Sequence, residues 1–250
     1  MSRQSNTRSG KFVASVSDAS AILKDFELLR NANLTWQTPS DDFLKVSKQD
    51  DYKQMYDTAI NHYDYNLILV DGSIFQFEEF ENSDLRYAYI QAPYNYVPFE
   101  DFLLTFMNAE DIPKDSSDMM ELKCTFENDY EQMLSEQGIN SKVVYFRYDV
   151  DSVRYMPNIH SYAHLHIGIS NDIRIPCASL LTPAAFVVFV IKQVYKVNWE
   201  RCMAEKDSRS KILKLAKDKC LLGEDKWDEM ERQAVSYTHL RAHETLMNLV

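Results

Sequence analysis

The chain has 250 residues, 45% of them hydrophobic, and a formal net charge of −11 at pH 7. This length and hydrophobic content suffice for one domain with a sizeable core. The acidic balance disfavours broad non-specific binding to phosphate backbones. Only five glycines occur, and their spacing excludes the glycine-rich loops of P-loop and Rossmann sites, so no nucleotide cofactor is expected.

Both ends of the chain are expected to lie outside the folded domain. Residues 1–16 are polar and are predicted to be disordered. Residues 235–250 resemble one reading frame of a sequencing-library adapter, so we interpret them as a non-native tail, which leaves the natural C-terminus open. Between these ends we predict a single α+β domain over residues 17–221 and a C-terminal extension over residues 222–234.

The cysteines and the apolar segments indicate a cellular compartment. No two of the four cysteines have Cys-x-x-Cys spacing, and the N-terminus lacks the apolar core of a signal peptide. The most apolar run, residues 184–194, is shorter than the ~20 residues that a membrane-spanning helix needs. We therefore expect a cytoplasmic protein that has reduced thiols and no membrane partner.

The first half of the chain predicts helices followed by a β-meander. A helix capped by Ser17 or Asp18 comes first, and a second helical stretch over residues 40–62 is broken near Ser47. The period then changes to two, and strands are predicted over residues 65–70, 73–80 and 85–91, with Asp71-Gly72 as the turn of the first hairpin. On the third strand, Tyr87 and Tyr89 are expected to face away from Arg86.

The second half predicts two more strands between helices. A helix is expected to start at Pro98, followed by an acidic loop over 110–118 and a helix over 126–136 that ends at Gly138. Strands are expected over 142–149 and 163–168. A helix over 184–196, with Thr182 as cap and Pro183 in its first turn, and a charged helix over 200–221 complete the chain. The order of elements argues for one α+β domain. We predict a mostly antiparallel sheet of about five strands, with helices before, between and after the strands.

Three of the six histidines lie in one short stretch, and they form the candidate site. His164 and His166 share one face of the predicted fifth strand, and His160 lies in the loop that leads into it. On the predicted fourth strand, Arg147 and Asp149 share a face by the same alternation, and so does Asp151 if the strand extends that far. If the two strands are neighbours, imidazole, guanidinium and carboxylate groups converge.

This convergence is open to two chemistries and to a purely structural interpretation. The histidine pair can act as general base and acid on a phosphodiester while Arg147 stabilises the developing charge, without metal or cofactor. Alternatively, His-x-His supplies two metal ligands, and His160 or Asp149 supplies a third. In the structural interpretation, cross-strand hydrogen bonds satisfy the histidines, and an ion pair between Arg147 and Asp149 fixes the strand register.

Two further features have a functional and a simpler interpretation. The tyrosine-rich meander could stack on nucleic-acid bases, but sheet packing with hydroxyls that reach solvent explains it more simply. The basic segment over residues 201–219 could bind RNA or an acidic partner, but a solvated helix surface accounts for it.

Four short motifs, in their order along the chain, carry a resemblance. They are residues 67–77, 86–89, 146–149 and 164–168. Together they resemble the uncharacterised bacterial family catalogued as domain of unknown function twenty-two ninety, over about residues 18–199. The resemblance implies no activity. A looser similarity of the Arg-Tyr-Asp and His-x-His strands to toxin components of bacterial toxin–antitoxin pairs favours nucleic-acid chemistry.

These observations lead to one hypothesis and two alternatives. The hypothesis is a phosphodiester-directed enzyme, acting on RNA in a bacterial defence or toxin–antitoxin system, with His164, His166, Arg147, Asp149 and His160 as catalytic residues and no cofactor. Because the chain is acidic, an operon-encoded protein partner is expected to supply affinity for nucleic acid. The alternatives are a non-catalytic protein-interaction module and a metal-dependent hydrolase.

Overall fold

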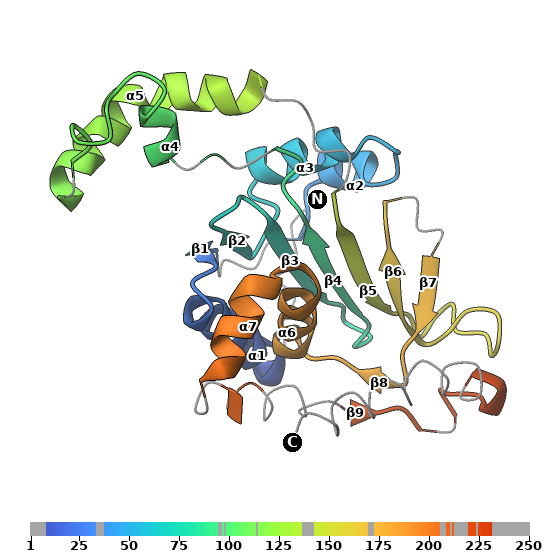
Figure 1. Ribbon diagram of the computed structural model, residues 1–250. Helices are drawn as coiled ribbons and strands as arrows, with labels where there is room; N and C mark the ends of the chain where they lie inside the picture. Colours follow the sequence, from blue (N-terminus) through green and yellow to red (C-terminus); the bar gives the residue numbers. More distant parts are fainter. Residues whose placement is uncertain are drawn as a thin grey trace. The chain divides into compact units, whose positions relative to one another are not determined.

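A computed structural model shows the fold (Figure 1). It describes residues 9–33, 38–94, 97, 99–113, 115–136, 143–169, 173–205, 209–210, 212, 220–223 and 225–231. The chain forms two compact units, one of Met1–Gln91 with Val144–Val250 and one of Ala92–Val143. The single domain that we predicted over residues 17–221 therefore contains a second compact unit, inserted between its third and fourth predicted strands.

The first unit is built on a seven-stranded antiparallel sheet in which each strand pairs with the next along the chain. The strands are β1 (Leu29–Ala32), β2 (Leu67–Leu69), β3 (Ile74–Glu79), β4 (Leu85–Ile90), β5 (Tyr145–Val150), β6 (Ala163–Ile167) and β7 (Ile173–Pro176). All five predicted strands are present, so the antiparallel α+β class is confirmed. The predicted number of strands is wrong, because β1 and β7 extend the sheet at its two edges.

The two missed strands are short and largely exposed. Each has four residues and none is fully buried, so neither shows the alternation that identifies a half-buried strand. β1 also follows closely on the first helix, which ends at Asp25. Glu27 has a φ of 57°, which ends the helix and turns the chain into the strand.

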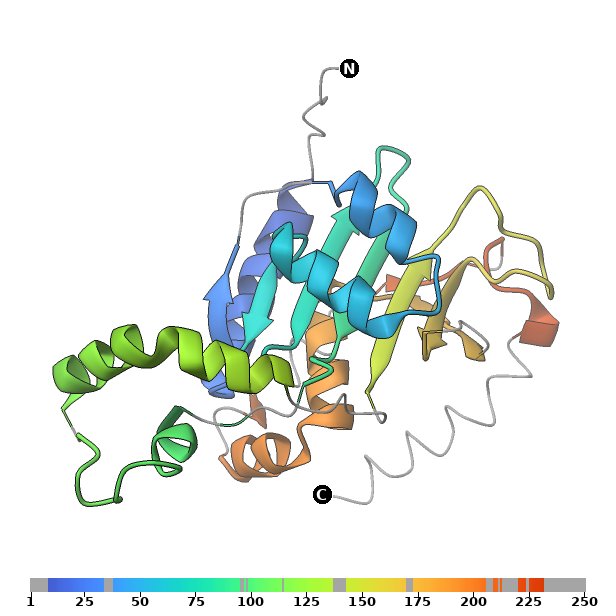
Figure 2. The ribbon, with the colours of Figure 1, turned by 90° about the horizontal axis from the view of Figure 1, so that it is seen from above.

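Helices cover both faces of the sheet (Figures 1 and 2). One face carries α1 (Gly10–Asp25), α6 (Pro183–Val194) and α7 (Lys196–Ala204), and the other carries α2 (Asp41–Val46) and α3 (Tyr52–Asn61). The main core lies between the sheet and α1 with α6, where aromatic rings from β3 and β4 pack against Phe186 and a ring of β5 packs against Phe189. This core leaves the opposite face of β4 to β7 available for polar side chains.

The first helix begins earlier than predicted. The side chain of Ser9, not Ser17 or Asp18, accepts the capping hydrogen bond, from the backbone N–H of Phe12. Phe12 and Val16 are buried and extend the apolar stripe of the helix toward its N-terminus. The prediction of a disordered N-terminus is therefore wrong for residues 10–16.

The remaining helices of this unit follow their predicted signals in part. Ser47 follows the last residue of α2, as predicted, and Asp51 caps α3. Thr182 caps α6 with Pro183 in its first turn, as predicted. The charged helix that we predicted over residues 200–221 is wrong at its end, where β9 (Cys220–Leu221) pairs with β8 (Ser179–Leu180). No helix in the described parts is long and apolar enough to cross a membrane.

Two tyrosines of the meander pack in the core, and their hydroxyls do not reach solvent as expected, whereas Tyr63 before the first strand of the meander is 64% exposed. Tyr87 and Tyr89 are fully buried. The hydroxyl of Tyr89 lies 2.9 Å from that of Tyr195, which donates to Asp71 in the first hairpin turn. A base-stacking role for these two rings is excluded by their burial.

The second unit contains α4 (Phe99–Leu103) and α5 (Ser116–Glu136). Its small core consists of Phe99, Phe102 and Leu103, against which rings and methionines of α5 pack. α5 starts ten residues earlier than predicted and takes in the end of the predicted acidic loop. Pro98 and Gly138, the predicted helix boundaries, lie outside the described residues.

Candidate functional site

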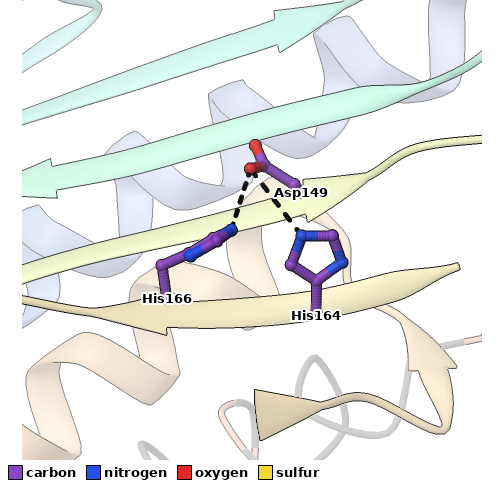
Figure 3. A group of neighbouring side chains, drawn as sticks. All are labelled: Asp149, His164 and His166. Atoms are coloured by element: carbon purple, nitrogen blue, oxygen red, sulfur yellow. Dashed lines mark ion pairs between the residues drawn. The ribbon is translucent and has the colours of Figure 1, made fainter. Parts of the chain in front are cut away.

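The two strands of the candidate site are neighbours in the sheet. β5 and β6 pair so that Asp149 lies opposite His164 and Arg147 lies opposite His166. Tyr148 and Leu165 point into the main core. Their neighbours along each strand therefore point to the other face of the sheet, which also carries α2 and α3 (Figure 2). The structure thus brings together the two imidazoles and the carboxylate (Figure 3), and the guanidinium of Arg147 lies beside the same carboxylate.

The carboxylate of Asp149 is the centre of the site. Its Oδ1 accepts a hydrogen bond from Nε of Arg86 at 3.0 Å, and its Oδ2 accepts one from Nε of Arg147 at 2.9 Å. The same Oδ2 lies 3.4 Å from Nε2 of His166 and 4.0 Å from Nε2 of His164 (Figure 3). One buried carboxylate therefore connects side chains from β4, β5 and β6.

These contacts keep Asp149 ionised. Burial by itself raises the pKa of this carboxyl group, but the contact with His166 and the charges of Arg147 and Arg86 lower it by more. The resulting pKa lies well below the ordinary range of an aspartate. Asp149 thus carries a full negative charge at any physiological pH.

The two strand histidines are almost completely covered. His164 is 2% exposed and His166 is 1% exposed, and their ring centroids lie 4.8 Å apart. Nδ1 of His164 lies 2.9 Å from the carbonyl oxygen of Ser161, which can only accept, so Nδ1 carries the proton. Burial, and after it the charge of His166, lowers the pKa of His164 to about 4, so this ring is neutral at pH 7.

His160 completes the histidine group from the loop before β6. Its ring meets that of His164 edge to face, with 4.9 Å between centroids, and it is only half-buried. The buried Nδ1 atoms of His160 and His166 have no hydrogen-bond partner within the described parts of the chain. Asp151 does not join the cluster but accepts the backbone N–H of Arg154 in the loop.

Two arginines of the site were missed by sequence reasoning. Arg86 reaches Asp149 from β4 because Arg86 and Asp149 lie opposite each other in the register. Arg174 lies opposite His166 on β7, and its charge is one of the causes that lower the pKa of His164. Alternation already placed Arg86 on the face opposite Tyr87 and Tyr89, but only the pairing of β4 with β5 shows that this is the face of the site and that Asp149 is its partner. No local pattern singled out Arg174.

The site also offers a set of metal ligands. Asp149, His164 and His166 each present one ligand atom, and these three atoms lie within 4.8 Å of one another. Two imidazoles with one carboxylate form a donor set that suits zinc and other divalent transition metals. Of the two third ligands proposed from the sequence, Asp149 is in this group.

Comparison with protein families identifies the chain at the level of a family. The family model described as "Uncharacterized conserved protein (DUF2290)" matches residues 20–241. The chain belongs to the DUF2290 family. The match confirms the resemblance seen in the sequence motifs and includes every residue of the candidate site. It ends inside the segment 235–250, which lies outside the described residues. No curated protein and no solved structure matches the chain.

Proposed function

We propose that this DUF2290 protein is an enzyme that acts on phosphodiesters, with RNA as its substrate class. The observation that carries the proposal is the grouping of three guanidinium groups around two imidazoles and a carboxylate, on one face of four adjacent strands. Guanidinium groups bind phosphate and stabilise the charge that develops on it during cleavage.

The arginines of this cluster are a local group of positive charges on an acidic chain. Arg86, Arg147 and Arg174 carry three positive charges, while Asp149 at the centre and, at the edges, Glu78 opposite Arg86 and Glu231 beside Ser161 carry negative ones. The net charge of the whole chain is −11, so a phosphate would find its favourable contacts at these guanidinium groups. Arg86 keeps 45% of its side chain exposed, and Arg174 is exposed as well.

The three histidines differ in burial, and this difference assigns them different roles. A general acid or base has to reach the reacting atoms, and the rings of His164 and His166 are covered. His160 is the more exposed member of the group and touches the ring of His164. We therefore assign proton exchange with the substrate to His160, and we place the two strand histidines with Asp149 behind it.

The unsatisfied nitrogens favour a functional over a structural role. Buried polar groups that serve stability alone are nearly always hydrogen-bonded. Here two imidazole nitrogens, on His160 and His166, are buried and without a partner in the described residues. A group of histidines selected only to fix strand register would not require such unpaired atoms.

Cleavage and binding of a fluorescent single-stranded RNA test the proposal. His160→Ala should abolish cleavage, and Arg174→Ala should weaken RNA binding and reduce the slope of log affinity against log salt by about one. Arg201→Ala is the matched control, because Arg201 lies on α7 at the opposite face and pairs with Glu27. Absence of RNA cleavage by the folded wild-type protein, or an equal loss of binding in Arg201→Ala, would contradict the proposal.

The biological setting that we propose is bacterial defence or a toxin–antitoxin pair. Induced expression of the wild type should then stop growth and degrade cellular RNA, whereas His160→Ala should be harmless at equal protein level. Equal growth of cells that express the two proteins would remove this setting.

A protein-interaction module is the second candidate, and one observation favours it. The loop between β5 and β6, beside the site, exposes Val153 and Ile159 at 81% and 75%, and Met156 by more than half. Exposed apolar groups of this density fit a protein contact. If the chain is such a module, Val153→Ser with Ile159→Ser should abolish co-purification with the protein of the neighbouring gene, and wild-type RNA cleavage should be absent.

A further inference from the structure

We propose that Asp149, His164 and His166 bind a divalent transition-metal ion of the zinc class. This inference stands on geometry and does not depend on the proposed function. The three ligand atoms converge from two adjacent strands, within 4.8 Å of one another. This spacing lets a single ion contact all three after small side-chain movements.

The hydrogen bond of His164 supplies the second argument. Nδ1 donates to the carbonyl of Ser161, which leaves Nε2 as the ring nitrogen that is available to an ion. Nε2 faces Oδ2 of Asp149 at 4.0 Å, in a region where both residues are buried (Figure 3). At this distance the two atoms do not form a hydrogen bond with each other, so an ion that binds between them displaces no hydrogen bond of that pair.

The surroundings resemble the outer shell of a metal site. Metal-bound histidines usually donate their second N–H to a carbonyl or carboxylate, as His164 does to Ser161. Ligating carboxylates are usually held by hydrogen bonds, as Asp149 is held by Arg86 and Arg147. Both arrangements fix the orientation of a ligand before any ion arrives.

Titration with Co²⁺, followed by its visible absorption, tests the ion site. The histidines His239 and His243 of the segment 235–250 are replaced by alanine in every sample, so that these two imidazoles cannot contribute to the binding. We expect one equivalent of Co²⁺ to bind, with affinity lowered at least about 100-fold in His164→Ala and in His166→Ala. His62→Ala, at the exposed end of α3, should bind as the parent does.

His166→Ala is the decisive variant, because it leaves the contacts of Asp149 with both arginines in place. Circular dichroism confirms its fold. Absence of Co²⁺ binding to the parent, or equal binding by His166→Ala, overturns the ion site.

The outcomes also separate the ion site from the proposed function. RNA cleavage that persists in EDTA, without Co²⁺ binding, would leave the enzyme proposal standing and reject the metal. Stoichiometric Co²⁺ binding without RNA cleavage would support the ion site and reject the enzyme proposal.

Discussion

Acidification should destabilise the metal-free protein through His164. The folded state lowers the pKa of this imidazole from 6.5 to about 4, mainly by burial. Between these two values the unfolded chain binds a proton that the folded chain does not, so stability falls as the pH falls through this window. The contribution of the neutral His164 to stability is fully present above the pKa of the unfolded state.

The size of the effect follows from the two pKa values. At about pH 5 the unfolded imidazole is almost fully protonated while the folded ring is still mostly neutral, which corresponds to about 2 kcal/mol of lost stability relative to about pH 7.5. The ring is only 2% exposed, so solvent screening reduces this value little. Asp149 does not interfere, because its pKa is lowered and its contribution is lost only at more acidic pH.

Urea unfolding in EDTA at both pH values measures the effect. His164→Asn keeps a donor toward the carbonyl of Ser161 but cannot take up the proton. The wild type should lose about 2 kcal/mol more than this variant on acidification, and His62→Asn should behave as the wild type does. If wild type and His164→Asn lose the same stability, the burial of a neutral imidazole is not what the structure indicates.

Three further predictions concern the stability of the first unit. Phe186→Ala removes a fully buried ring from the core and should lower the free energy of unfolding in urea by about 3–5 kcal/mol. Val197→Ala, at a position 78% exposed, should change this free energy by less than about 0.5 kcal/mol. Similar values for both variants would contradict the assigned core. Thr182→Ala removes the cap of α6 and should cost about 1 kcal/mol, with Thr182→Ser restoring most of it. Asp149→Ala should lower the free energy of unfolding by about 2 kcal/mol. This value lies between the values typical of exposed and of fully buried ion pairs, because the arginine partners of Asp149 stay partly exposed. An unchanged denaturation midpoint would show that the carboxylate network contributes nothing.

Much of the fold could be predicted because its signals are local. The Asp71-Gly72 turn, the period-two alternation around it and the Thr182-Pro183 helix start all depend on a few consecutive residues. The edge strands β1 and β7 were missed because their exposed side chains leave no alternating pattern. The second compact unit was missed because it is defined by contacts and not by composition.

The candidate site, like the fold, was predicted only where its signals are local. Alternation alone placed His164 with His166, and Arg147 with Asp149, on common faces, because the side-chain period of a strand needs no partner. The neighbour of each strand, and hence the contact of Arg86 with Asp149, depends on pairing between segments some sixty residues apart. The burial of both imidazoles depends on the same pairing.

The amino-acid sequence by itself thus determined the fold class, the family and which side chains share a face of a strand. Only the tertiary structure decided that β5 lies beside β6 in the register that sets Asp149 opposite His164. It also decided that three arginines surround them and that the rings are covered. The physical reason is that alternation is encoded over a few residues, whereas register and burial arise from contacts between distant segments.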